Sequence, residues 1–142
     1  RRDGVALEPL VGELNARGAK RKLVIVDAAR RNPFERRLRG FSSGLAPIAA
    51  PEGTLVLYGV APGKVAADTQ APNSLLVNEL LGQLRGSNGS AEDIFNRTRV
   101  TVARASNGEQ VPAVFSALVD DFYFAPPASE PSKKPAKRQS MR

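Results

Sequence analysis

The chain has 142 residues, of which 42% are hydrophobic, enough for one domain of ordinary size with a real core. It contains neither cysteine nor histidine, which excludes disulfide bonds, thiolate metal sites and catalysis by a cysteine or histidine side chain. There is no run of about 18 apolar residues, so no transmembrane helix is expected. No signal peptide is visible, and the first residue, Arg1, leads us to expect a fragment or a processed chain.

Part of the formal net charge of +7 lies in the C-terminal segment. Residues 125–142 are rich in proline, serine and lysine and offer little to a core, so we expect a disordered tail after a domain of residues 1–124. The tail has one acid, Glu130, and five basic residues: Lys133, Lys134, Lys137, Arg138 and Arg142. A solubilising terminus is favoured over contact with nucleic acid or an anionic surface.

The first half of the chain predicts one helix and two strands. Residues 8–17 suit a helix with Pro9 in its first turn and Gly18 at its C-terminal cap. Residues 23–28 (LVIVDA) are a continuous apolar run without alternation, which is typical of a strand buried on both faces of a parallel sheet. TLVLYGV, residues 54–60, is a second run of this kind.

Two more helices are predicted in the second half. Residues 74–85 are amphipathic, and Asn73 is a suitable N-cap. A further helix is predicted over 91–106, where Ser90 and Asp93 resemble a capping box.

The end of the ordered part is predicted to form a sheet edge. Gly108 stops the last helix, residues 111–118 suit a short strand, and Pro112 places that strand at an edge or makes it irregular. Residues 122–124 (FYF) suit packing against the core. The fold class is therefore α/β with covering helices. Three or four strands are few for a stable parallel sheet, so we expect neighbouring strands that lie upstream or come from another chain.

The best location for a site is the edge at which the two apolar strands end. Ligands of open α/β sheets bind beyond the carboxyl ends of the strands. Asp27, Ala28 and Ala29 end the first strand, and residues 60–68 follow the second. If the strands are parallel neighbours, these segments face one cleft.

Other motifs give weaker candidates. GVAPGK resembles a phosphate-binding loop, but its glycine spacing is short and Val65 stands where serine or threonine is needed. The adjacent acids Asp120 and Asp121 favour turn or capping roles over shared chemistry. The arginine-rich segment 30–39 keeps a nucleic-acid surface open as a less favoured alternative.

Three segments carry a resemblance to a known family. VIVDAARRNPF, residues 24–34, resembles the Asp-Ala-Cys-Arg-x-Asn-Pro-Phe segment of bacterial caspase-like (metacaspase-type) cysteine peptidases. GLAPIAAPEGTLVLYGVAPGKVAAD, residues 44–68, is similar to the family's next strand and cleft-lining loop. QVPAVFSALVDDFYF, residues 110–124, resembles its closing signature. The resemblance covers residues 5–124 in order, as the C-terminal part of a catalytic domain.

The resemblance implies a caspase-like fold, with a mostly parallel sheet flanked by helices and with N-terminal strands missing from this chain. It implies peptide hydrolysis by a cysteine and a histidine. The family's nucleophile falls on Ala29, and its histidine lies upstream of residue 1, so the chain is expected to be inactive as written. The Ala29 position has two open explanations, an introduced substitution or a natural loss that leaves a peptide-binding scaffold.

The resemblance also implies the residues that bind the substrate. Asp27 would line the first specificity pocket and receive an arginine or lysine side chain, whereas the alternative is that it caps the turn through backbone N–H groups. The loop that borders the peptide comprises Val65, Ala66, Ala67 and Asp68. Arg36, Arg37 and Arg39 would suit self-processing of an active parent.

No cofactor and no metal site are expected, since the chain shows no acidic cluster for the calcium that some metacaspases need. The expected partners are a peptide or protein with a basic residue and the missing N-terminal half of the domain, in the same precursor or another chain. Contact with a membrane is not expected. A cytoplasmic location is expected from the absent signal and the resemblance.

Overall fold

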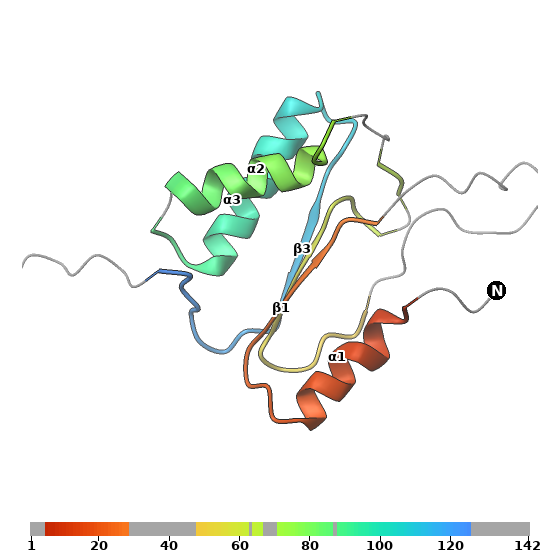
Figure 1. Ribbon diagram of the computed structural model, residues 1–142, viewed down its shortest axis with the longest axis vertical. Coiled ribbons are helices and arrows are strands. Elements are labelled where there is room, and N and C mark those ends of the chain that lie inside the picture. The colour runs from red at the N-terminus through yellow and green to blue at the C-terminus, as the bar shows by residue number, and fades with distance from the viewer. Residues whose placement is uncertain (1–4, 29–47, 63, 67–70, 87, 126–142) are drawn as a thin grey trace, which may run out of the picture.

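The computed structural model describes residues 5–28, 48–62, 64–66, 71–86 and 88–125 (Figure 1). The predicted helices and strands all occur in it, with boundaries that differ by one or two residues. In chain order they are α1 (Leu7–Ala16), β1 (Lys22–Val26), β2 (Thr54–Tyr58), α2 (Leu75–Gly86), α3 (Ala91–Ala105) and β3 (Ala113–Ser116). No helix in the described ranges combines the length and the apolar character needed to cross a membrane.

The described strands form one mixed sheet in the order β1-β2-β3. β1 and β2 are parallel, with Lys22 beside Thr54 and Val26 beside Tyr58, as their lack of alternation predicted. β3 is antiparallel to β2 at the edge, and Pro112 lies just before it, as expected of a residue that cannot donate to the ladder. The expected mostly parallel sheet is therefore present here as one parallel pair and one antiparallel pair.

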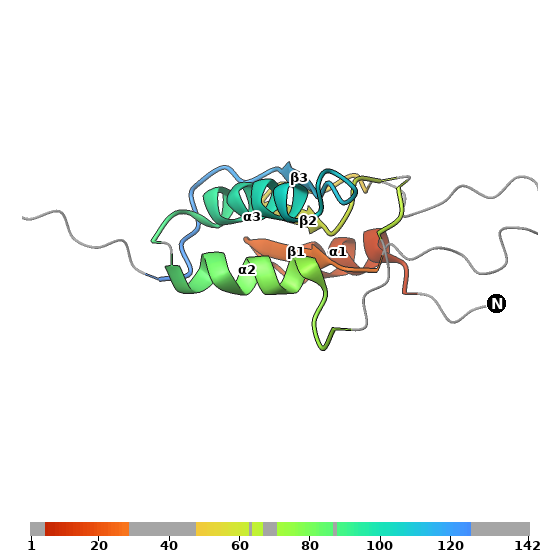
Figure 2. The same ribbon diagram turned by 90° about the horizontal axis from the view of Figure 1, so that it is seen from above.

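The core lies between one face of this sheet and the helices α2 and α3. Leu55 and Leu57 of β2 are fully buried in a cluster with residues of these helices, which include Leu76, Phe95 and Val102. α1 lies on the opposite side of the sheet (Figures 1 and 2). The described part of the chain thus forms three layers, and of its strands β2 is the one that is buried along its whole length.

β1 differs from the prediction that it is buried on both faces. Ile25 remains 47% exposed, and only Lys22 of this strand is buried. The physical reason is that, among the described strands, β1 has a neighbour on one side only, whereas β2 pairs with a strand on each side. Within the described residues, β1 therefore has the residue pattern of a central strand but the position of an edge strand.

Helix α1 ends as its sequence predicted. Gly18 has a positive φ of 85°, and its N–H donates to the Asn15 carbonyl at 3.0 Å. The Ala19 N–H donates to the Leu14 carbonyl at 3.1 Å. These two bonds form a Schellman motif, in which glycine at the left-handed position avoids strain from a Cβ. The motif turns the chain directly from α1 into β1.

The caps of α2 and α3 are confirmed in part. At α3 the Ser90 Oγ accepts from the Asp93 N–H, and the Asp93 carboxylate accepts from the Ser90 N–H, both at 3.2 Å, which is the predicted capping box. At α2 the cap is Ser74 and not Asn73, because the Ser74 Oγ accepts from the Val77 N–H at 3.1 Å. Both residue types are good caps, so sequence alone could not separate these neighbours.

Candidate functional site

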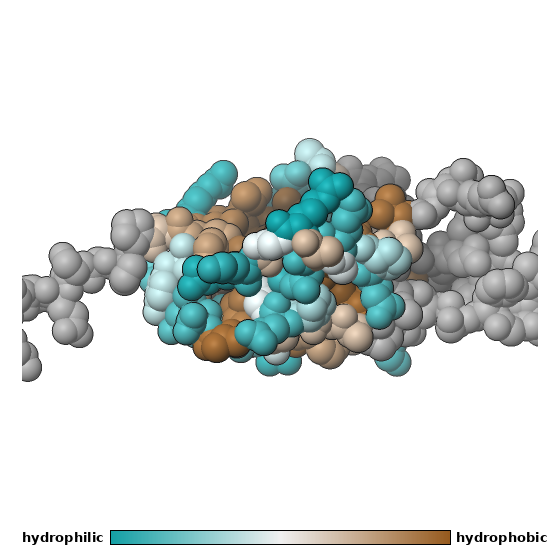
Figure 3. All heavy atoms as spheres, turned by 90° about the horizontal axis from the view of Figure 1, so that it is seen from below, coloured by the Kyte–Doolittle hydropathy of each residue, from teal (hydrophilic) through white to brown (hydrophobic). Residues whose placement is uncertain are grey.

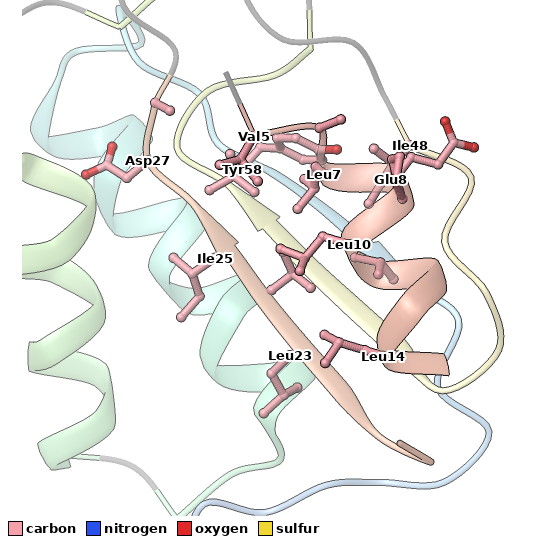
Figure 4. A pocket seen from close by; sticks show the side chains of 16 residues that line it. Val5, Leu7, Glu8, Leu10, Leu14, Leu23, Ile25, Asp27, Ile48 and Tyr58 are labelled. Carbon is pink, nitrogen blue, oxygen red and sulfur yellow. The ribbon is translucent and has the colours of Figure 1, made fainter. Parts of the chain in front are cut away.

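Asp27 directly follows β1 and is exposed at the carboxyl end of the parallel pair. Its side chain lies on the same side of β1 as Ile25, away from α1 (Figure 4). Gly59, which directly follows β2, lies beside this side chain, and a Cβ added there would lie only 3.0 Å from Asp27 Oδ1. The Gly59 N–H donates to the Val26 carbonyl at 2.8 Å, which extends the pairing one step beyond the strands. The predicted meeting of the two strand ends is confirmed.

Gln110 connects this edge to the end of α3. It is buried, and its Nε2 donates to the Gly59 carbonyl at 2.7 Å. Its own backbone is held by Ser106, whose Oγ accepts from the Gln110 N–H and donates to the Gln110 carbonyl, both at 3.0 Å. Sequence reasoning noted Gln110 only as part of a signature and missed Gly59. A signal existed for Gly59, which is a glycine directly after an apolar strand-like run, whereas Gln110 stands only two positions before Pro112 and has no clear local signal.

The predicted peptide-bordering loop is described only in part. Val65 and Ala66 are half-buried after β2, and Val65 lines a hollow of about 410 Å³ with Lys64 and Glu109. Asp27 lines a different hollow, so in the described ranges these two predicted residues do not share one pocket. Three further predicted residues lie outside the described ranges: Ala29, Ala67 and Asp68.

Asp27 also borders an open groove of about 740 Å³ between α1 and β1, although its side chain points to the other side of β1 (Figure 4). Most of its lining is apolar, including Leu10, Leu14 and Val24. Tyr58 is 1% exposed, and its hydroxyl makes no hydrogen bond in the described part of the chain. Burial raises the pKa of the Tyr58 phenol, an effect that the nearby Ile48 backbone partly opposes. The groove is thus suited to apolar side chains.

The other acidic candidates do not form a site. The Asp120 carboxylate lies 3.8 Å from the Arg21 guanidinium, whereas Asp121 accepts a 3.3 Å hydrogen bond from the Tyr123 hydroxyl. The charge of Asp121 is the main cause of a raised Tyr123 pKa. The adjacent carboxylates therefore have separate surface contacts. Across the described ranges, no group of three or more acidic, histidine or cysteine residues could hold a metal ion.

Comparison with known families agrees with this geometry. Residues 9–123 match the family profile described as Caspase domain. The match covers most of the chain, and the chain belongs to this family. No curated protein matches it. The chain has no cysteine, so it lacks the thiol that serves as nucleophile in cysteine peptidases.

Proposed function

We propose that the chain carries the substrate-recognition part of a metacaspase-type cysteine endopeptidase site with a preference for arginine or lysine, with Ala29 in the place of the nucleophile. With alanine at the nucleophile position, such a site binds a peptide without cleaving it. The observation that carries the proposal is the exposed Asp27 carboxylate at the carboxyl end of β1, beside the end of β2, in a chain of the caspase-domain family.

The chemistry follows from what each position can do. A carboxylate at the edge of a cleft can accept two parallel hydrogen bonds from a guanidinium, which is a strong and selective contact. Hydrolysis needs a thiolate that attacks the peptide carbonyl and an acid that protonates the leaving amine. The methyl group of Ala29 has no lone pair, and the chain has no histidine, so no acyl-enzyme forms on this chain alone. Recognition and cleavage are therefore separable here.

The recognition step predicts a charge-dependent affinity. In the full-length protein, a peptide with one arginine should bind about 10- to 100-fold more tightly than the same peptide with citrulline, which has nearly the same shape without the charge. Asp27→Asn should reduce this ratio to about one. Isothermal titration at constant salt measures both dissociation constants. Asp121→Asn is the matched control and should leave the ratio unchanged. Equal affinities of the unmodified protein for both peptides would refute the proposal.

A second candidate is a peptide-binding scaffold that has lost catalysis by natural change, favoured by the alanine at position 29. The variant Ala29→Cys of the full-length protein separates the two. Cleavage after arginine or lysine supports a disabled peptidase, whereas binding without cleavage supports the scaffold. Binding of DNA with a steep salt dependence, without selectivity between peptides, would instead support a nucleic-acid-binding function of the basic segments.

The proposed domain also includes another strand beside β1. Ile25 is 47% exposed on one side of β1, and Leu10 and Leu14 of α1 are exposed on the other. From the α1 side, apolar patches remain visible among the polar groups (Figure 3). Helix α1 passes directly into β1, as in a right-handed crossover from a parallel neighbouring strand. These features support a strand that precedes α1 in the same polypeptide and is apolar on both faces.

If the proposed strand lies beside β1, Ile25 should be buried in the full-length protein. Ile25→Lys should then lower the free energy of unfolding by about 2 kcal/mol or more, because an unpaired charge would be buried. The matched control Val119→Lys changes a residue that is 73% exposed and should stay within about 0.5 kcal/mol. Urea denaturation measures both. Equal small effects would contradict the proposal, and an effect that grows with protein concentration would assign the strand to another chain.

A further inference from the structure

We propose that Gly59 and Gln110 are positioning residues that fix the Asp27 carboxylate and so determine the discrimination between basic and neutral side chains. This inference rests on the proposed function. Neither residue would touch the peptide, since both are buried. They would act through the backbone of Gly59, which lies beside the Asp27 side chain.

Gly59 matters because of the space that its missing side chain leaves. Its backbone is not in the left-handed region, so conformation alone does not require glycine there. A Cβ at this position would lie 3.0 Å from Asp27 Oδ1, 3.3 Å from Leu76 Cδ2 and 3.5 Å from the Val26 carbonyl oxygen. Leu76 is fully buried in the core and cannot readily move. The Asp27 carboxylate is the free end of an exposed side chain, so it is the group that a Cβ would displace.

Gln110 matters because its side chain donates a hydrogen bond to the carbonyl group of Gly59. The Gly59 N–H is bonded to the Val26 carbonyl at 2.8 Å, and the Gly59 carbonyl to Gln110 Nε2 at 2.7 Å. The two backbone groups of Gly59 are therefore anchored to β1 on one side and to the end of α3 on the other. Ser106 fixes Gln110 in turn through two bonds of 3.0 Å. This chain of contacts anchors the backbone beside Asp27 both to β1 and to the segment after α3.

Asp27 itself has no hydrogen bond or ion pair to another described residue. The space beside Gly59, which an added Cβ would fill to within 3.0 Å of Asp27 Oδ1, is thus the described feature that leaves room for its carboxylate. A bidentate contact with a guanidinium depends on the placement of both carboxylate oxygens. A shift of a few tenths of an ångström should weaken this contact more than it weakens the uncharged contacts of the same peptide.

The test measures the ratio of the citrulline-peptide to the arginine-peptide dissociation constant in the full-length protein. Gly59→Ala should lower this ratio about fivefold and Gln110→Met about threefold, because each displaces the carboxylate without removing it. The matched controls are Gly82→Ala, where nothing lies within 4 Å of the added Cβ, and Gln83→Met on α2. Both controls should leave the ratio unchanged.

The ratio separates positioning from general stability, because both peptides bind the same folded fraction. If Gly59→Ala does not fold, Gln110→Met tests the same residue through its carbonyl group. Ratios within twofold of the parent for both variants, while Asp27→Asn lowers the ratio to one, would overturn the positioning role and leave the proposed function intact. A parent ratio of one would overturn the proposed function itself.

Discussion

Gly53→Ala is expected to lower the free energy of unfolding by about 3 kcal/mol or more. Gly53 has a φ of 76°, where a side chain is strained, and its added Cβ would lie 2.0 Å from the Lys20 carbonyl oxygen. That atom is backbone, so relief requires the chain to move. The movement would disturb two bonds of Gly53, one from its N–H to the Ala117 carbonyl at 2.7 Å and one from the Lys22 N–H at 2.8 Å. These bonds join the start of β1 to the end of β3.

Urea denaturation followed by circular dichroism measures this effect. Gly12→Ala and Gly82→Ala are the matched controls, because nothing lies within 4 Å of either added Cβ and both sit inside helices. These controls should raise the free energy of unfolding by about 0.5–1 kcal/mol, since alanine favours the helix. A Gly53→Ala protein within about 1 kcal/mol of the parent would show that the turn adapts and that our account of it is wrong.

Lys22→Met is expected to lower the free energy of unfolding by about 2–4 kcal/mol. Lys22 is 4% exposed, and its ammonium donates to Asn15 Oδ1, the Ala19 carbonyl and the Glu52 carbonyl at 2.9–3.0 Å. A buried ammonium is tolerated here because all three of its N–H groups are bonded, close to the negative end of α1. Methionine keeps the apolar stem but leaves three acceptors without this donor.

A lysine two positions earlier in the chain provides the comparison for Lys22. Lys20 is exposed, so Lys20→Met should change the free energy of unfolding by no more than about 0.5 kcal/mol in the same titration. Similar effects of the two substitutions would mean that the three bonds of Lys22 contribute little. The difference between the variants therefore measures how strongly α1 is fixed to the sheet.

The sequence predicted where the candidate site lies in the sheet better than it predicted how the residues around the site are arranged. The rule that ligands bind at the carboxyl ends of parallel strands placed Asp27 beside the segment after β2, and the contact with Gly59 confirms this. The same rule did not separate the hollow at Val65 from the groove that Asp27 borders. The course of a loop depends on distant contacts, such as the bond from the Ala61 N–H to the Val111 carbonyl at 2.9 Å.

The sequence by itself determined the helices, the strands and the family, because each depends on patterns within short stretches of chain. The apolar run before Asp27 and the capping box at Ser90 are examples. The sequence only suggested the parallel pairing of β1 with β2, which joins distant residues and was decided by the tertiary structure. Only the tertiary structure decided which residues hold these pieces together. Lys22 bonds a residue 30 positions away, and Gln110 one 51 positions away. The exposure of Ile25 likewise depends on how many strands lie beside β1, and no local pattern contains that number.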